Sequence, residues 1–214
     1  MEEKNLHDDK TTINISVFHG SNKILKAEDI ILPGLRKHYD FGPGFYLTES
    51  RKIAEEWIVD EETPVVNEYL LSVPGNKVLY LRDREWLQVV VGFRSKLFNA
   101  HFSSPVIHGL IANDRLVDAI EIFRQGAIGD IRLFECLKMV ELGNQYLLRE
   151  NTNYLKWVGS KVVKGSELQR AGFRRMQKRR DMEKRVRAIY RKQAVNELFY
   201  DDYLEKGAFH EISV

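Results

Sequence analysis

The chain has 214 residues, of which 43% are hydrophobic and 30% charged, so it can build a folded core. No apolar run reaches the roughly 20 residues that a membrane-spanning helix needs, and the acidic start MEEKNLHDDK lacks the pattern of a secretory signal. The single cysteine, Cys136, excludes an internal disulfide and a cysteine-rich zinc site. We therefore expect a cytoplasmic protein that makes no membrane contact.

Charged residues are distributed unevenly along the chain. Residues 161–192 carry 13 basic and three acidic side chains, whereas the whole protein has a net charge of only +2. We place a boundary here and expect a domain over 1–160 and a basic helical extension over 161–214. Such a charge run is often only a solvated helix face. Its functional alternative is a contact for nucleic acid or for an acidic partner.

Hydrophobic spacing predicts alternating short strands and helices in the first 160 residues. Strand patterns cover residues 13–18, 45–48, 65–73, 78–81, 105–111 and 145–149, and a last short element begins at 155. Helical spacing covers residues 50–59, 84–98, 116–125 and 131–142, and the last two are closed by glycines. This order is too irregular for a doubly wound parallel sheet. It indicates an α+β fold with mostly antiparallel sheets.

The segment His19-Gly20-Ser21 follows the first strand. Such a place can present an imidazole, an exposed backbone amide and a hydroxyl to one ligand, with glycine allowing a flat ligand to approach the main chain. The simpler alternative is an ordinary turn with a surface histidine.

The segment DFGPGFYLT, residues 40–48, is more specific. Its glycines allow tight backbone geometry, and Phe45 and Tyr46 alternate, so one ring should enter the core and the other should face elsewhere. A positioned Tyr46 could stack on a flat heterocycle. The alternative is a hairpin with core aromatics. The glycine spacing matches neither a dinucleotide-binding nor a phosphate-binding loop, and the histidine spacing predicts no metal site.

Taken together in chain order, these motifs resemble those of a known protein family. The order is the strand with His19-Gly20-Ser21, then DFGPGFYLT, the helix with Ala54 and Trp57, the segment 111–115, and Gly143-Asn144-Gln145-Tyr146 opening a late strand. Over about residues 15–158 it resembles a bacterial family of uncharacterised small domains placed in the ADP-ribosyltransferase superfamily. The resemblance implies two small, packed, mostly antiparallel sheets that hold NAD in a cleft between them.

The resemblance also implies residue roles. His19 would bind the adenosine-side ribose, the Gly20 main chain would hold the nicotinamide amide, and Tyr46 would stack on the nicotinamide ring. Gln145 would occupy the third position of the superfamily, which is glutamate in many active members. The expected catalytic residues are His19, Tyr46 and Gln145, and the expected NAD-contacting residues are His19, Gly20, Ser21, Phe45, Tyr46 and Asp114.

Gln145 raises the question of catalysis, because a neutral amide can orient a ribose hydroxyl but cannot deprotonate an acceptor. Either the acceptor needs no base, or another carboxylate (Asp114, Glu141 or Glu150) reaches the site, or the domain binds without turnover. The first functional hypothesis is therefore a mono-ADP-ribosyltransferase that splits NAD and modifies a macromolecule. The second is a degenerate module that binds NAD, ADP-ribose or a partner, and the third is an RNA-binding protein that uses the basic tail.

Overall fold

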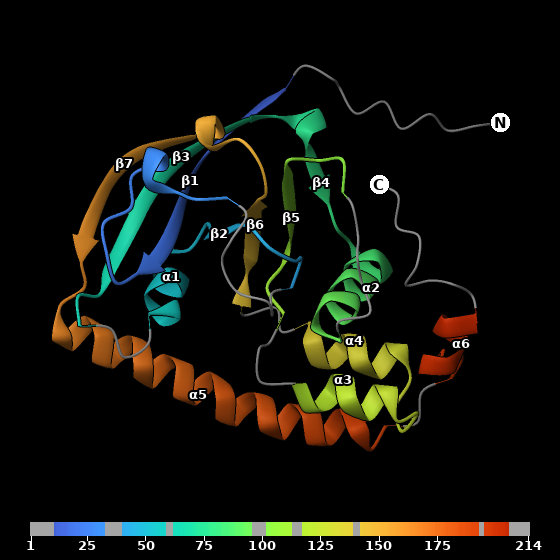
Figure 1. Ribbon diagram of the computed structural model, residues 1–214. Coiled ribbons are helices and arrows are strands. Elements are labelled where there is room, and N and C mark those ends of the chain that lie inside the picture. The colour runs from blue at the N-terminus through green and yellow to red at the C-terminus, as the bar shows by residue number, and fades with distance from the viewer. Residues whose placement is uncertain are drawn as a thin grey trace.

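The computed structural model describes residues 11–32, 40–58, 62–95, 102–112, 117–138, 142–192 and 195–205. The expected NAD-contacting residue Asp114 lies outside these ranges. The fold is α+β, as predicted, and is built on one mixed seven-stranded sheet with the strand order β4-β5-β6-β2-β1-β3-β7 (Figure 1). All neighbouring strands run antiparallel except β4 and β5.

The strands lie close to the positions that the alternation of apolar and polar residues predicts. They are β1 (Thr12–Ser21), β2 (Phe45–Thr48), β3 (Val65–Pro74), β4 (Val78–Tyr80), β5 (Val106–Leu110), β6 (Asn144–Leu148) and β7 (Leu155–Val162). The first strand runs three residues further than expected, so His19-Gly20-Ser21 forms its end instead of a turn after it. This segment is extended because it pairs with β3 up to Ser21, opposite Val65.

The sheet divides between β1 and β2. These two strands pair only at Phe18 and Thr48, whereas β1 pairs with β3 along its whole length. One half is therefore β7-β3-β1 and the other is β2-β6-β5-β4, which Figure 1 shows on opposite sides of the molecule. The sequence predicts two separate sheets, whereas the structure has a single sheet with a weak junction, because one pair of residues still connects the two halves.

Two large apolar clusters hold these layers. The first draws on both halves of the sheet and includes Val17, Tyr69 and Leu71 from one half and Phe45 and Tyr146 from the other. The second fixes the β2-β6-β5-β4 half to the helices α2 (Asp83–Arg94), α3 (Val117–Arg124) and α4 (Asp130–Leu137), and to the C-terminal helices. A smaller third cluster packs Ala54 of the helix α1 (Arg51–Trp57) against Val66 of β3. Cys136 is fully buried in this second cluster, where burial raises the pKa of its thiol to about 12.

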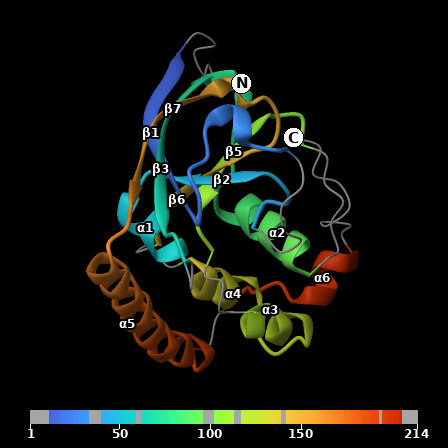
Figure 2. The same ribbon diagram turned by 60° about the vertical axis from the view of Figure 1, so that its left-hand side comes forward.

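The C-terminal part forms the long helix α5 (Gly165–Tyr190) and the short helix α6 (Tyr200–Glu205), which lie along the edge of the molecule in Figure 2. Met182, Val186 and Ile189 of α5 and Tyr203 of α6 enter the second apolar cluster. The C-terminal helices are therefore packed onto the preceding fold. The expected division at residue 160 falls inside β7, which continues to Val162.

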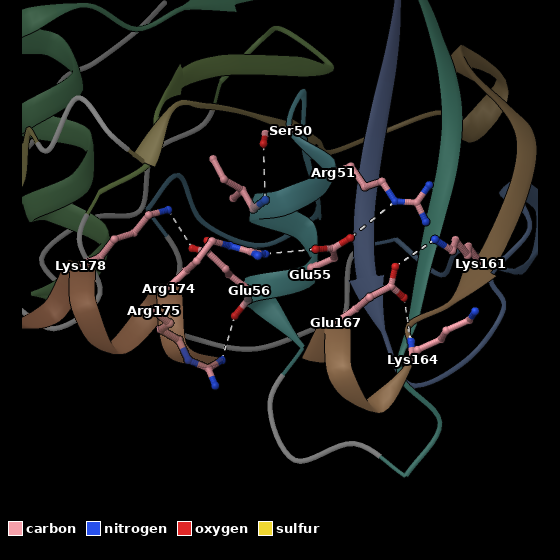
Figure 3. Close-up of polar contacts among 11 residues, drawn as sticks. Ser50, Arg51, Glu55, Glu56, Lys161, Lys164, Glu167, Arg174, Arg175 and Lys178 are labelled. Carbon is pink, nitrogen blue, oxygen red and sulfur yellow. Dashed lines mark hydrogen bonds and ion pairs between the residues drawn. The ribbon is translucent and has the colours of Figure 1, made fainter. Parts of the chain in front are cut away.

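Figure 3 shows the side chains that attach α5 to α1, where Arg174 and Lys178 point towards Glu55 and Glu56.

Within the described residues, no helix is both long enough and apolar enough to cross a membrane.

Candidate functional site

Thr48 of β2 is the residue at which the motif-bearing strands meet. It pairs with Phe18 of β1 on one side and with Gln145 of β6 on the other. The strands that carry His19, Tyr46 and Gln145 are thus consecutive in the sheet. Since neighbouring strands lie about 4.8 Å apart, the three motif segments come within roughly 10 Å of one another.

His19 spans the junction between β1 and β2. Its Nδ1 lies 2.8 Å from the backbone oxygen of Tyr46, and its ring centroid is 4.3 Å from that of Phe45. A carbonyl oxygen only accepts, so Nδ1 carries the proton and donates it. This bond and the contact with Phe45 fix both the tautomer and the orientation of the imidazole.

Tyr46 is placed differently from the prediction. Its ring is buried in the cluster that faces the helices, whereas Phe45 and Leu47 enter the cluster that joins the two halves of the sheet. The rings of His19 and Tyr46 therefore lie on opposite faces of β2, since successive side chains of a strand alternate. The prediction that both rings face one pocket is wrong for this arrangement.

The Tyr46 hydroxyl has a structural task. It donates to the Gly42 carbonyl over 2.7 Å and accepts from the Phe41 amide over 3.0 Å. Gly42 has a φ of +90°, which favours glycine, so the hydroxyl fixes a turn that few other residues could form. Tyr46 thus positions the loop before β2 with its side chain and His19 with its carbonyl.

Gly20 and Ser21 are also occupied by contacts within the protein. A Cβ atom on Gly20 would lie 2.0 Å from the backbone oxygen of Ala54, so this glycine allows β1 to lie directly against α1. The Ser21 hydroxyl donates to the Lys23 carbonyl over 2.6 Å and accepts from the Asn67 amide over 3.1 Å. The packing of β1 against α1 is therefore sufficient to require glycine at position 20, and the expected contact of its main chain with a ligand stays a prediction.

Gln145 lies in a buried polar network. Its Nε2 donates to Oδ2 of Asp40 over 2.7 Å and to the Leu110 carbonyl over 3.3 Å. The same Asp40 accepts from Nε of Arg94 and from the backbone amide of Ala112, each over 2.9 Å. Asp40 and Gln145 are 5% and 3% exposed, so water contributes little to either group.

Asp40 is the carboxylate that sequence reasoning missed. It opens the DFGPGFYLT segment, but nothing in its local pattern indicates a partner 105 residues further along the chain. Of the carboxylates considered from sequence, Asp114 and Glu141 lie outside the described residues, and Glu150 is exposed beyond the end of β6.

Asp40 and Arg94 form an ion pair within this network. Arg94 supplies one positive charge and Asp40 one negative charge, and Gln145 joins them as a neutral donor. A glutamate at 145 would bring a second carboxylate against Asp40 in a site of low dielectric constant, which is costly without another cation. The amide at this position is therefore the residue type that the buried carboxylate favours.

Two further observations concern the molecule outside the network of Asp40, Arg94 and Gln145. A hollow of about 600 Å³ between α4 and α5 is lined partly by Ile131, Phe134 and Ile189 and contains none of the motif residues. In the described ranges, no three histidine, cysteine, aspartate or glutamate side chains are grouped to hold a metal ion.

Comparison with known proteins finds one family. No curated protein and no solved structure matches the chain. The model of the family described as "Protein of unknown function (DUF3990)" matches residues 15–157, which is more than half of the chain and includes His19, Tyr46 and Gln145. The chain belongs to this DUF3990 family.

Proposed function

We propose that this protein is an NAD-dependent ADP-ribosyltransferase that transfers ADP-ribose to a macromolecular acceptor. The observation that carries the proposal is the meeting of the His19, Tyr46 and Gln145 segments on three adjacent strands around Thr48. The Tyr46 ring takes no part in stacking, because it is buried and its hydroxyl is bonded to the Gly42 carbonyl. The proposal rests on an oriented imidazole at the β1–β2 junction and on the Gln145 amide that Asp40 holds in place.

His19 is the binding residue of this proposal. Its ring is held by the Tyr46 carbonyl, so little side-chain entropy remains to be lost when the imidazole contacts a ribose hydroxyl. Tyr46 acts through His19 and is a positioning residue.

The Asp40–Gln145 pair is suited to the chemistry of the sugar. Breaking the bond between nicotinamide and C1′ releases neutral nicotinamide and leaves positive charge on the ribose, as in glycoside hydrolysis. An acceptor oxygen or nitrogen then forms the new bond to C1′ and loses its proton. In this proposal the Gln145 amide, which Asp40 holds in one orientation, orients the ribose during this step.

The experiment is to incubate the full chain with adenine-labelled NAD and a cell lysate, and to measure nicotinamide release and transfer of label. We expect wild type to release nicotinamide and His19→Ala to lose at least about tenfold in rate, as expected when a positioned polar group is removed. Lys23→Ala, an exposed substitution just beyond β1, is the matched control and should behave as wild type. Equal rates for wild type and His19→Ala would overturn the proposal.

A specific observation favours a second candidate, which is a module that binds NAD or ADP-ribose without turnover. Both N–H groups of the Gln145 amide are used inside the protein, and Arg94 already neutralises Asp40. Calorimetric binding of NAD that is lost in His19→Ala, without any nicotinamide release, would select this candidate. Absence of NAD binding by wild type would remove both.

A further inference from the structure

The long helix α5 has a docked side and an outer side. On the docked side Ala171, Met182, Val186 and Ile189 are buried. Three basic residues assist them: Arg174 contacts Glu55 and Glu56 over 3.1 Å, Lys178 contacts Glu56 over 2.9 Å, and Arg175 donates to the Glu56 carbonyl over 2.8 Å (Figure 3). These bases serve to attach α5 to α1, so they are not available to a partner.

The outer side carries a second, separate set of side chains, which we name the outer stripe. Its members lie three or four residues apart, so they share one face of the helix, opposite the buried residues. They are Phe173, Met176, Arg180, Lys184, Arg187 and Arg191. All six are exposed, including Phe173 at 57% and Met176 at 42%.

The four cations of the outer stripe have no counter-charge. Within the described part of the chain, Arg180, Lys184, Arg187 and Arg191 make no hydrogen bond through their side chains and no ion pair. Other exposed bases nearby are paired: Arg179 contacts Glu183, and Lys192 contacts Glu135, each over 3.1 Å. No member of the stripe is acidic. The fold therefore leaves a continuous line of positive charge on this one face.

We propose that the outer stripe binds the phosphate backbone of nucleic acid. At 1.5 Å per residue, Arg180 to Arg191 spans about 16 Å in a straight line, which suits a polymer with regularly repeated negative charges. Three of the four cations are arginines, whose planar guanidinium groups bind phosphate through paired hydrogen bonds. Phe173 and Met176 extend the stripe with apolar surface that a base can cover.

The packing of α5 argues against a membrane as the partner. A helix that lies on a lipid surface buries an apolar face in the lipid. The apolar face of α5 is already buried in the protein, and the outer stripe offers only Phe173 and Met176.

The proposed contact of the outer stripe with nucleic acid involves phosphates and not base edges, so binding should depend little on nucleotide sequence. This proposal does not rest on NAD chemistry.

Salt dependence gives the proposal a quantitative signature. Release of counterions from about four phosphates predicts a slope of about −3 to −4 in a plot of log K against log salt concentration. Affinity should therefore fall roughly 100-fold between about 50 and about 200 mM salt. Each cation removed should reduce the steepness of this slope by about one.

The test uses the full chain and fluorescent RNA or duplex DNA of about 20 nucleotides, with binding measured by fluorescence anisotropy over a salt series. The test variant combines Arg180→Gln, Lys184→Gln, Arg187→Gln and Arg191→Gln. The control combines Lys23→Gln, Lys26→Gln, Lys77→Gln and Lys156→Gln, four exposed substitutions elsewhere that change the net charge equally. Thermal unfolding of all three proteins verifies that each is folded.

We expect the outer-stripe variant to lose roughly 100-fold in affinity at about 50 mM salt and most of its salt dependence, and the control to stay within about threefold of wild type. Three results would overturn the proposal: equal binding by wild type and the outer-stripe variant, an equal loss in the control, or binding that salt does not weaken. Binding of wild type to phosphatidylserine vesicles or to polyglutamate, without binding to nucleic acid, would also overturn it and would identify a different class of partner.

Discussion

Gln145 and Asp40 are joined by a hydrogen bond of 2.7 Å from the amide Nε2 to the carboxylate Oδ2, although 105 residues separate them in the chain. The bond ties strand β6 to the loop before β2. Through Arg94 it also reaches the C-terminal end of α2. A polar side chain at 145 thus contributes both to the candidate site and to the packing of three elements.

Exchanging the two groups tests this relationship. Asp40→Asn should lower the free energy of unfolding by about 3–5 kcal/mol, because it removes the buried carboxylate that pairs with Arg94. Gln145→Glu should also be destabilising, because it places two carboxylates together. The double variant restores one carboxylate and one amide, so its loss should be smaller than the sum of the single losses by about 1–3 kcal/mol. Urea unfolding measures all four proteins, and strict additivity would contradict the network.

Replacing Gly20 by a residue with a side chain should destabilise the protein. In Gly20→Ala the new Cβ would lie 2.0 Å from the Ala54 oxygen and 2.8 Å from Cγ1 of Ile58, so α1 or β1 must move. We expect a loss of about 2–3 kcal/mol in the free energy of unfolding. Gly159→Ala is the matched control, because nothing lies within 4 Å of its added Cβ, and it should change stability by less than about 1 kcal/mol. Thermal or urea unfolding decides, and equal effects would contradict the close contact of β1 with α1.

His108 should make stability depend on pH. Its Nε2 is buried without a hydrogen-bond partner among the described residues, 3.8 Å from Oε1 of Glu49. Burial lowers the pKa of His108 below its ordinary value of 6.5, and Glu49 only partly opposes this. Between that lowered pKa and 6.5 the unfolded chain binds more protons, so stability falls as pH falls through this window.

The measurement compares unfolding of wild type and His108→Gln between about pH 7 and pH 5. We expect wild type to lose up to about 1.4 kcal/mol per pH unit more than the variant. Parallel curves would show that His108 does not change its protonation between the folded and unfolded states in this range. Tyr80 and Tyr146, whose rings contact His108, have raised pKa values because of burial and do not titrate there.

Glu56 should hold α5 in place. Its carboxylate is 9% exposed and accepts from Arg174 and Lys178, which are themselves 32% and 24% exposed. With solvent screening taken into account, Glu56→Gln should lower the free energy of unfolding by about 1–2 kcal/mol and speed trypsin cleavage within α5. Glu183→Gln removes an ion pair on the same helix in which both partners are more than half exposed, and it should cost less than about 0.5 kcal/mol. Equal cleavage rates in these two variants would contradict the docking role of Glu56.

The elements themselves could be predicted because their signals are local. The strand at 45–48 and the start of the strand at 65 were predicted at the observed residues, and the helices differ mainly at their ends. Alternation of side chains and the positions of proline and glycine depend only on near neighbours in the chain. The end of β1 was missed, because Ser21 is extended through pairing with β3 and not through its own pattern.

The candidate site was predictable only in part. That Phe45 and Tyr46 face opposite sides follows from their positions, but which side each ring takes depends on which cluster each half of the sheet buries. The sequence likewise offered three carboxylates for Gln145, of which Asp114 and Glu141 lie outside the described residues, and the structure brings a further one, Asp40, to it.

By itself, the sequence determined the α+β class, the positions of most strands and helices, and the concentration of positive charge in residues 161–192. Only the tertiary structure decided that β6, β2 and β1 are neighbours, that Asp40 meets Gln145, and which bases of α5 attach it to α1. The physical reason is that each of these contacts joins segments far apart in the chain. Local patterns fix the conformation of each segment, whereas the burial of apolar surface and the pairing of buried charges fix how the segments are brought together.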